Sequence, residues 1–232
     1  MLLRQENNGR VSAETAGLWL HREQIVWRRP RPVLGPKAPD YAYKLGKIRH
    51  LLATLPDDET AVFEDEVDVN TNPKIGAMWK PRGQQAVVVT PGTNVKRYLA
   101  GSLHWRTGEL FVSSPGTQRN AELFIRHLKD LCRRLRRYRR IHVIRDNAKF
   151  HDCVRVQEFL ARWDCRIVLH FLPKYAPQTN PIERVGWHLH EEITRNHRRQ
   201  TIDELVELVF DWFVYKSPFA IESSIYPQAV AA

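Results

Sequence analysis

The amino-acid sequence predicts an α/β fold in which helices flank a mixed sheet of antiparallel and parallel strands. Three observations support this prediction. Short apolar segments of the kind that form strands fill residues 61–114, between turns rich in Gly, Asn and Pro. After residue 120, helical and strand patterns alternate along the chain. The strand–helix–strand order of residues 141–171 implies a right-handed parallel crossover, so the sheet is expected to be mixed and covered by helices.

Residues 1–40 are expected to form a small appendage ahead of this fold. Residues 12–24 have a short helical pattern, with Ser12 and Thr15 as candidate caps. Residues 30–40 hold four prolines in eleven positions, a composition that breaks helices and strands and is typical of a linker. We therefore divide the chain into residues 1–40 and a larger domain of residues 41–232, which opens with a helix over residues 41–55.

The larger domain alternates between the two kinds of element. Apolar or alternating segments predict strands over residues 61–69, 84–91, 98–105, 109–114, 141–146 and 165–173. Apolar residues at helical spacing predict three helices, marked by Phe124, Leu128, Leu131 and Leu135, by Val156, Phe159, Leu160 and Trp163, and by Leu205, Val206, Val209 and Phe213. A further helix is predicted over residues 181–193.

Composition and charge narrow the classes of function. The 232 residues, 43% of them apolar, are enough to bury a core. A formal net charge of +10 favours nucleic acid as a partner, although a basic protein without such a partner fits the charge as well. Three cysteines without a CxxC pair predict a reduced, intracellular protein without structural zinc. The sequence has no membrane-span-length apolar run, no signal-peptide pattern and no GxxxxGK[ST] phosphate loop, so a membrane protein and ATP-driven chemistry are not expected.

Three acidic residues stand at special places in the predicted fold. Asp65 lies inside the first strand, Asp146 ends the strand of residues 141–146, and Glu183 lies in the first turn of a helix. A carboxylate in an apolar strand is costly unless it is paired or binds a metal. Ligands gather at the carboxyl ends of the strands in a crossover sheet, where these three residues can meet. Hard oxygen ligands without a His/Cys cluster suit Mg²⁺ or Mn²⁺, and such a site can support phosphodiester displacement.

Each of the three acids also has a structural interpretation. Asp65 is one of several acids that fit a solvated edge strand, and Asp146-Asn147 fits an Asx turn after a strand. Asn180 as N-cap, Pro181 at the first helical position and Glu183 three residues after the cap resemble a capping box. Taken singly, these interpretations are sufficient, and only the combination of the three acids favours a metal site.

The sequences around the acids resemble the DDE transposases of the mariner-related group, a branch of the DDE superfamily endonucleases found in bacterial insertion sequences. Glu64-Asp65-Glu66 is similar to the family's first acidic motif. Residues 146–151 (DNAKFH) are similar to its D-N-A-x-x-H motif, and residues 171–183 (FLPKYAPQTNPIE) to its third, most specific motif. Residues 79–83 (WKPRG) look like the family's segment after the first acid, and the likeness runs from about Arg29 to Trp212.

The resemblance implies a ribonuclease-H-like fold and cleavage and joining of DNA. Mg²⁺, for which Mn²⁺ can substitute, would be held by the catalytic residues Asp65, Asp146 and Glu183. Water would cut a phosphodiester at the element's end, and the freed 3′-hydroxyl would attack target DNA. The resemblance also implies a homodimer on double-stranded DNA and a cytoplasmic, nucleoid-associated protein. Supporting roles would fall to Glu66, Asn147, His151 and Asn180.

Two departures from the family's pattern keep other functions open. Only the end of a helix-turn-helix module precedes the nuclease domain, so an N-terminally truncated transposase is expected. Gly186 stands where the family commonly has Trp, and a glycine inside a helix costs about 1 kcal/mol relative to Ala and leaves space unfilled, so weakened activity is expected. The alternatives are a non-catalytic DNA-binding remnant and a ribonuclease-H-like nuclease without strand transfer.

Two groups of arginines are candidate DNA contacts. The denser group lies at the end of the helix after Asn120. These arginines would also interact favourably with the negative carboxyl end of the helix dipole on a solvated face, without any contact to DNA. As phosphate contacts, the arginines would bind DNA in a salt-dependent way. The second group belongs to the linker and would reach a minor groove. The candidate residues are Arg133, Arg134, Arg136, Arg137, Arg139 and Arg140 in the first group and Arg28, Arg29 and Arg31 in the second.

Overall fold

The computed structural model describes residues 11–26, 38–162, 166–221 and 225–226. The chain divides into two compact units, Met1–Gly35 and Pro36–Ala232. In the first unit, α1 (Ala13–Arg22) corresponds to the predicted first helix, and the side chain of Ser12 caps it by accepting a hydrogen bond from the backbone N–H of Thr15 at 3.1 Å. The linker arginines Arg28, Arg29 and Arg31 lie outside the described residues.

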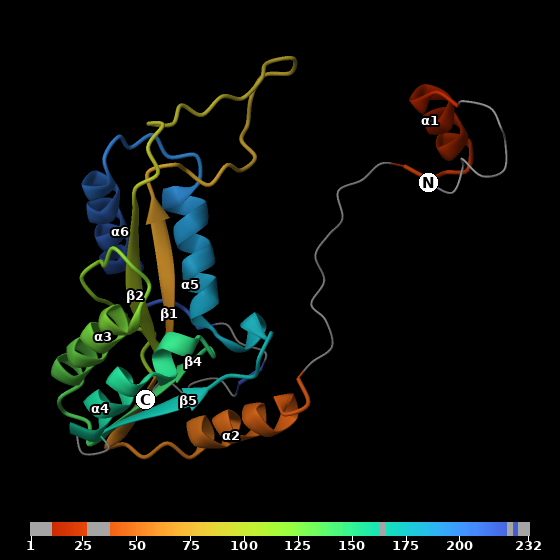
Figure 1. Ribbon diagram of the computed structural model, residues 1–232. Coiled ribbons are helices and arrows are strands. Elements are labelled where there is room, and N and C mark those ends of the chain that lie inside the picture. Colours follow the sequence, from red (N-terminus) through yellow and green to blue (C-terminus); the bar gives the residue numbers. More distant parts are fainter. Residues whose placement is uncertain (1–10, 27–37, 163–165, 222–224, 227–232) are drawn as a thin grey trace. The chain divides into compact units, whose positions relative to one another are not determined.

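The second unit is built on a sheet that has five strands in the described part of the chain, in the order β3-β2-β1-β4-β5 (Figure 1). β2 is antiparallel to both β1 and β3, whereas β4 is parallel to both β1 and β5. The mixed sheet predicted from the sequence is therefore confirmed, and the parallel pair β1–β4 lies near its centre. The strands are β1 (Glu59–Asn70), β2 (Lys96–His104), β3 (Leu110–Val112), β4 (Arg140–Arg145) and β5 (Ile167–Phe171).

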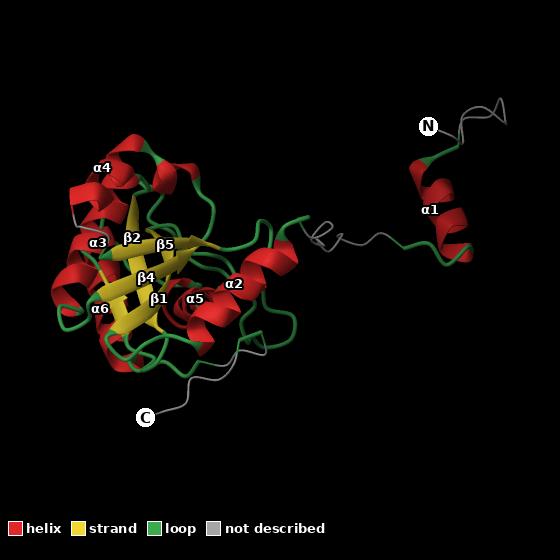
Figure 2. Ribbon diagram, turned by 90° about the horizontal axis from the view of Figure 1, so that it is seen from below, coloured by secondary structure: helices red, strands yellow, loops and turns green. Residues whose placement is uncertain are grey.

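Helices cover both faces of the sheet (Figure 2). The main helices of this unit are α2 (Tyr41–Ala53), α3 (Ala121–Arg134), α4 (Val154–Arg162), α5 (Ile182–Leu189) and α6 (Ile202–Lys216). Val62 of β1 shares a buried core with α3 and α4, whereas Phe63 shares a core with α2, α5 and α6. Successive side chains of a strand point to opposite faces of the sheet. Because helices cover both faces, Val62 and Phe63 are both fully buried. No helix within the described ranges is long and apolar enough to cross a lipid bilayer.

Short helical turns connect the strands to the main helices near the carboxyl ends of β4 and β5. The turns η2 (Lys149–Asp152) and η3 (Pro177–Thr179) are 3₁₀-helical, and η4 (His190–Thr194) is a π-helical turn that continues α5. The single helix predicted over residues 181–193 is thus present as α5 followed by η4.

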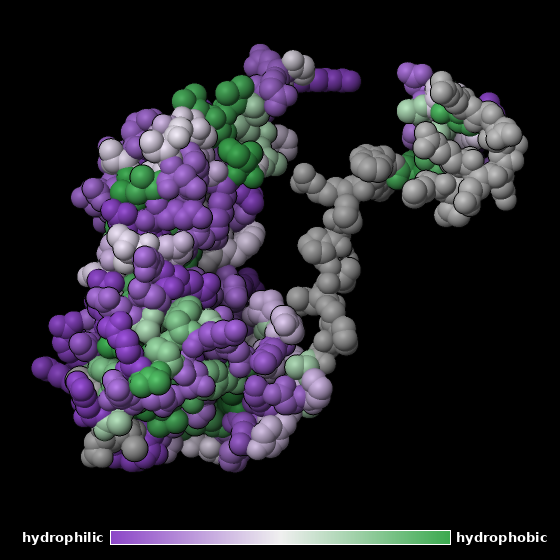
Figure 3. Space-filling view, viewed as in Figure 1, coloured by the Kyte–Doolittle hydropathy of each residue, from purple (hydrophilic) through white to green (hydrophobic). Residues whose placement is uncertain are grey.

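One predicted strand is not formed. Residues 84–91 lie in the loop of residues 71–95 between β1 and β2, and they have no strand structure. The prediction was wrong because a strand needs a neighbour for its backbone hydrogen bonds, which an apolar sequence pattern alone does not provide. Val87 and Val89 are 64% and 68% exposed, and Trp79 is fully exposed. Figure 3 shows apolar surface at the end of the unit from which this loop extends.

Candidate active site

The register of the two central parallel strands brings Asp65 and Asp146 together. Phe63 of β1 pairs with Ile144 of β4, and Asp65 and Asp146 each follow two residues later. Asp65 is still inside β1, whereas Asp146 directly follows β4. An oxygen of each carboxylate lies 3.7 Å from the same nitrogen, Nη2 of Arg119. The carboxyl end of β4, where ligands gather in sheets of this kind, therefore has two acids side by side.

Glu183 joins the two aspartates from the first turn of α5. It lines a hollow of about 290 Å³ together with Asp65, and a second hollow of about 470 Å³ together with Asp146. Burial, and then the charge of Asp146, raise the pKa of the Glu183 carboxyl. The structure thus gathers all three residues predicted as metal ligands, and we call Asp65, Asp146 and Glu183 the open site.

The electrostatics of the open site favour a bound cation. Burial, and then the charge of Glu183, raise the pKa of Asp65 to about 7. The crowded carboxylates disfavour one another's ionised forms, and a divalent cation would reverse that effect. Three oxygen donors that open onto solvent suit Mg²⁺ or Mn²⁺, which take oxygen ligands and keep room for water and substrate oxygens. The residues present therefore fit such an ion.

The loop after β4 is held by two side-chain hydrogen bonds. Oδ1 of Asp146 accepts a hydrogen bond from the backbone N–H of Ala148 at 2.9 Å, which is the Asx turn considered from the sequence. Its other oxygen, Oδ2, faces Arg119. Nδ2 of Asn147 donates to the backbone oxygen of Leu172 at 2.6 Å and so ties the loop to the end of β5. The turn therefore fixes Asp146 and still leaves one of its oxygens toward the open site.

The start of α5 is not a capping box. Nδ2 of Asn180 donates to the backbone oxygen of Glu64 at 3.1 Å, which ties the chain ahead of α5 to β1 beside Asp65. Within the described ranges no side-chain hydrogen bond caps α5, which follows Pro181 directly. α5 continues through Gly186, where an added Cβ would meet no atom within 4 Å. The side chain of Glu183 is thus not engaged in a cap.

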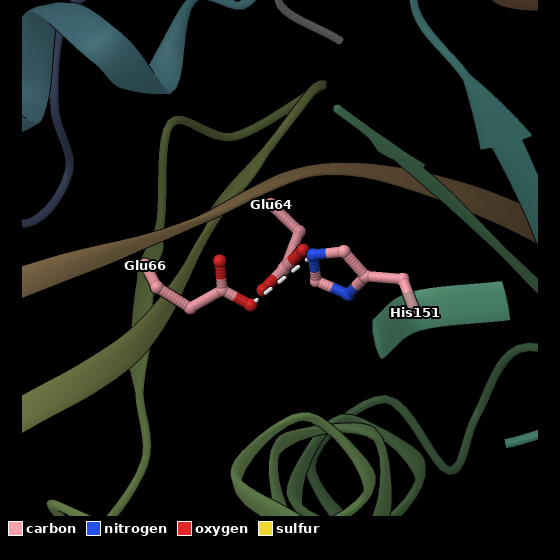
Figure 4. A group of neighbouring side chains, drawn as sticks. All are labelled: Glu64, Glu66 and His151. Carbon is pink, nitrogen blue, oxygen red and sulfur yellow. Dashed lines mark ion pairs between the residues drawn. The ribbon is translucent and has the colours of Figure 1, made fainter. Parts of the chain in front are cut away.

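A second group of ionisable residues lies on the other face of β1. Glu64 and Glu66 project from β1 toward His151 of η2 (Figure 4). Ligand atoms of these three buried side chains lie within 4.8 Å of one another. Nε2 of His151 is 3.3 Å from Glu66 Oε1, but neither atom has a hydrogen bond of acceptable geometry within the described part of the chain. Nε2 is also 3.5 Å from Asp146 Oδ1, so His151 stands between the two faces.

Arg145 completes this second group, which we call the closed cluster (Glu64, Glu66, Arg145 and His151). Its buried guanidinium is stacked between the rings of Phe124 and Phe171, at 4.8 and 4.7 Å from their centroids. Burial lowers its pKa to about 10, against the opposing charge of Glu64. Burial also raises the pKa of Glu64, and the positive charge of Arg145 opposes that shift. Arginine counter-charges and the lack of access for solvent or phosphate oxygens make the closed cluster the less suitable place for Mg²⁺.

Sequence reasoning missed Arg119 and Arg145. Arg119 precedes Asn120, the N-cap of α3, and no motif or spacing marks it. Arg145 had a usable signal, because a charged residue inside an apolar strand requires a compensating partner. The opposite charge nearest in effect, that of Glu64, became visible only with the register of β1 and β4.

The arginines of residues 133–140 lie at the opposite end of β4 from Asp146. Arg133 and Arg134 end α3, and Arg140 begins β4. Several members have partners inside the protein: Arg133 pairs with Asp130, Arg137 donates to the Tyr138 hydroxyl, Arg139 pairs with Asp58 and Glu59, and Arg140 pairs with Glu59. Arg136 is exposed. A strand of six residues spans roughly 20 Å, so these arginines are distant from the open site.

Comparison with known proteins assigns the class. Residues 60–206 match the family of DDE superfamily endonucleases. This match covers more than half of the chain and includes all three acids of the open site. The chain therefore belongs to the DDE superfamily endonucleases, as the resemblance of its motifs predicted.

Two kinds of relatives refine this assignment. Over 209 residues the chain is 38% identical to the insertion element IS630 uncharacterized 39 kDa protein of Shigella sonnei; the alignment covers 90% of this chain but only 60% of that relative. Among solved structures, the chain is similar to the Mos1 mariner paired end complex with Mn (TM-score 0.58, 19% identity, covering 94% of this chain and 70% of the other). It is also similar to the catalytic domain of Mos1 mariner transposase (TM-score 0.53, 17% identity, covering 82% and 87%). The fold is thus ribonuclease-H-like, as predicted.

Proposed function

We propose that this chain contains the catalytic domain of a DNA transposase, which cuts phosphodiesters at the ends of a mobile element and joins the freed 3′-hydroxyl to target DNA. The observation that carries the proposal is the gathering of Asp65, Asp146 and Glu183 at the carboxyl end of β4. Membership of the DDE superfamily endonucleases supports it. The 38% identity to an insertion-element protein also supports the proposal.

The residues of the open site would divide the work between binding and positioning. Asp65, Asp146 and Glu183 would hold Mg²⁺ or Mn²⁺, which supplies Lewis-acid stabilisation of the attacking and leaving oxygens in a phosphodiester displacement. Asp65 binds a cation only after losing its proton, so its raised pKa makes the ionised site sensitive to pH near neutrality. Asn147 and Asn180 hold the loop after β4 and the start of α5 in place. Nε2 of His151 lies 3.3 Å from Glu66 and 3.5 Å from Asp146, so His151 would help to position Asp146.

Double-stranded DNA is the proposed partner, both as element ends and as target. Mos1, the structural relative, has been solved as a paired-end complex with its left transposon end. The net charge of +10 supports attraction to DNA. Because the arginines of residues 133–140 are distant from the open site, we propose that they contact DNA away from the bond that is cut. Residues 1–40 would add a helical DNA-binding segment and a basic linker.

A homodimer on DNA is part of the same proposal. The loop of residues 71–95 exposes Ile75, Trp79, Val87 and Val89, and such an apolar group is unusual on a surface that meets only water. We propose that this loop contacts a second copy of the chain when two DNA ends are brought together.

The test is a cleavage assay with Mg²⁺ on DNA that contains the flanks of the element. This chain and an N-terminally extended one are compared. We expect Mg²⁺-dependent nicking at the element's ends, followed by strand-transfer products when target DNA is added. Nicking without transfer would reduce the proposal to a nuclease. DNA binding without nicking by either protein would contradict catalysis.

A further inference from the structure

Arg119 lies between the acids of the open site and those of the closed cluster. It belongs to the loop between β3 and α3, and its side chain is 39% exposed. From there its guanidinium reaches acids that come from two different strands. Nη2 is 2.9 Å from Glu66 Oε2, 3.7 Å from Asp65 Oδ1 and 3.7 Å from Asp146 Oδ2.

These contacts differ in kind. Both Nε and Nη2 of Arg119 are close to Glu66 Oε2, at 3.0 and 2.9 Å, so the guanidinium is anchored on Glu66. The distances of 3.7 Å to Asp65 and Asp146 are too long for hydrogen bonds. Arg119 therefore interacts with Asp65 and Asp146 only through its charge, and no hydrogen bond to either aspartate holds the guanidinium in place.

A divalent cation shared by the two aspartates would require the same space. Mg²⁺ binds oxygen at about 2.0–2.1 Å, so the two carboxylates would have to close around it where Nη2 now faces them both. Like charges at such a distance also repel. Although burial lowers the pKa of Arg119, the charge of Glu66 and the hydrogen bond with it raise the pKa above its ordinary value. The arginine thus stays charged, and relief of the repulsion requires the side chain to move.

We propose that Arg119 is a built-in counter-ion of the open site, and that a divalent cation must displace its guanidinium from Asp65 and Asp146 in order to bind. The inference rests on the proposed function. It assigns to Arg119 two effects: it weakens metal binding, and it stabilises the ionised forms of Asp65 and Asp146 when no metal is bound. If Arg119 were only a structural tie between β1 and the loop ahead of α3, its removal would lower stability and leave metal affinity unchanged.

The test is titration calorimetry of the full chain with MnCl₂. Arg119→Gln and Arg119→Met both remove the positive charge, and Met also keeps an apolar stem near the ring of Phe150. Arg119→Lys keeps the positive charge. Arg106→Gln is the matched control, because Arg106 also occupies a loop and pairs with a carboxylate, that of Asp57, but near the amino end of β1. Asp146→Asn removes a metal ligand. The metal-free melting temperature of every variant is measured as well.

We expect Arg119→Gln and Arg119→Met to bind Mn²⁺ about tenfold more tightly than wild type, which corresponds to about 1.4 kcal/mol. Arg119→Lys and Arg106→Gln should remain close to wild type, and Asp146→Asn should lose the binding heat. If the Gln and Met variants bind Mn²⁺ no more tightly than wild type while Asp146→Asn loses the heat, the counter-ion role is wrong and the proposed metal site stands. If none of the proteins gives heat that depends on Asp146, both proposals fail.

Discussion

Asp65 and its neighbours Glu64 and Glu66 belong to one strand, yet they meet opposite surroundings. Asp65 faces α5 and a hollow that opens to solvent. Glu64 and Glu66 point to the other face, where they lie beside His151 and where the charge of the buried Arg145 acts on both. Burial raises the pKa of all three carboxyls, but only the buried pair has an arginine packed into the core beside it. One strand thus separates an acid that faces a solvent-open hollow, with the half-exposed Arg119 3.7 Å away, from acids that share the core with a buried arginine.

The largest expected effect on stability comes from breaking the closed cluster. Arg145→Met would remove the buried positive charge that offsets those of Glu64 and Glu66, and a buried charge left uncompensated typically costs about 3–5 kcal/mol. We expect the free energy of unfolding in urea to fall by that amount. The double variant Glu64→Gln/Arg145→Met should regain part of the loss, because it removes both charges. Equal stabilities of the Arg145→Met variant and wild type would show that the arginine does not compensate these acids.

A smaller effect should follow from the pH dependence of the open site. The pKa of Asp65 is about 7 in the folded protein, against about 3.9 in an unfolded chain. Without metal, the folded state keeps a proton that the unfolded state has released, so this group's contribution to stability is full below about pH 4 and is lost as pH rises to about 7. In EDTA, the melting temperature of wild type should therefore fall relative to that of an Asp65→Asn variant between about pH 5 and about pH 7.

Asp65→Asn is the matched control for that titration, since Asn is close in shape and does not ionise. The pH dependence that both proteins share would come from the other groups with shifted pKa values. Among them are Glu64, Glu66 and Glu183, whose pKa values are raised, and His104, His127 and His170, whose pKa values burial lowers. If the melting temperatures of wild type and Asp65→Asn change equally with pH, the proton is held by a group other than Asp65.

The smallest effect concerns Gly186, which lines the hollow beside α5. An Ala side chain at position 186 would meet no atom within 4 Å, and Ala is favoured over Gly in a helix by about 1 kcal/mol. Gly186→Ala should thus raise the melting temperature by about 2–4 °C without changing metal binding. A lower melting temperature would mean that another part of the protein fills this space.

The sequence predicted most of this architecture because its main signals are local. Phe124, Leu128 and Leu131 showed a helix by spacing alone, and short apolar runs showed β4 and β5. The apolar run of residues 84–91 suggested a strand that does not form, since whether a segment forms a strand depends on a neighbour that no local pattern reveals.

The candidate site was predictable to a similar degree. Asp65, Asp146 and Glu183 were selected by their places inside a strand, at a strand end and at a helix start, and by motifs that resemble a family. Their gathering required only the parallel register. Arg119 was not predictable, because it reaches the acids from a loop whose path depends on how α3 packs. The roles of the three acids as metal ligands remain predictions. So do the roles of the arginines of residues 133–140 and of the linker as DNA contacts.

The most direct test of the open site is the Glu183→Gln variant in the Mg²⁺-dependent cleavage assay, performed on DNA that wild type cuts. Because α5 has no side-chain cap within the described ranges, the change should leave the metal-free melting temperature and DNA binding as they are. Loss of one metal-binding charge should reduce nicking by about 100-fold or more. A Glu183→Gln protein that nicks DNA as fast as wild type would remove Glu183 from the site and contradict the assignment of the three acids to one metal centre.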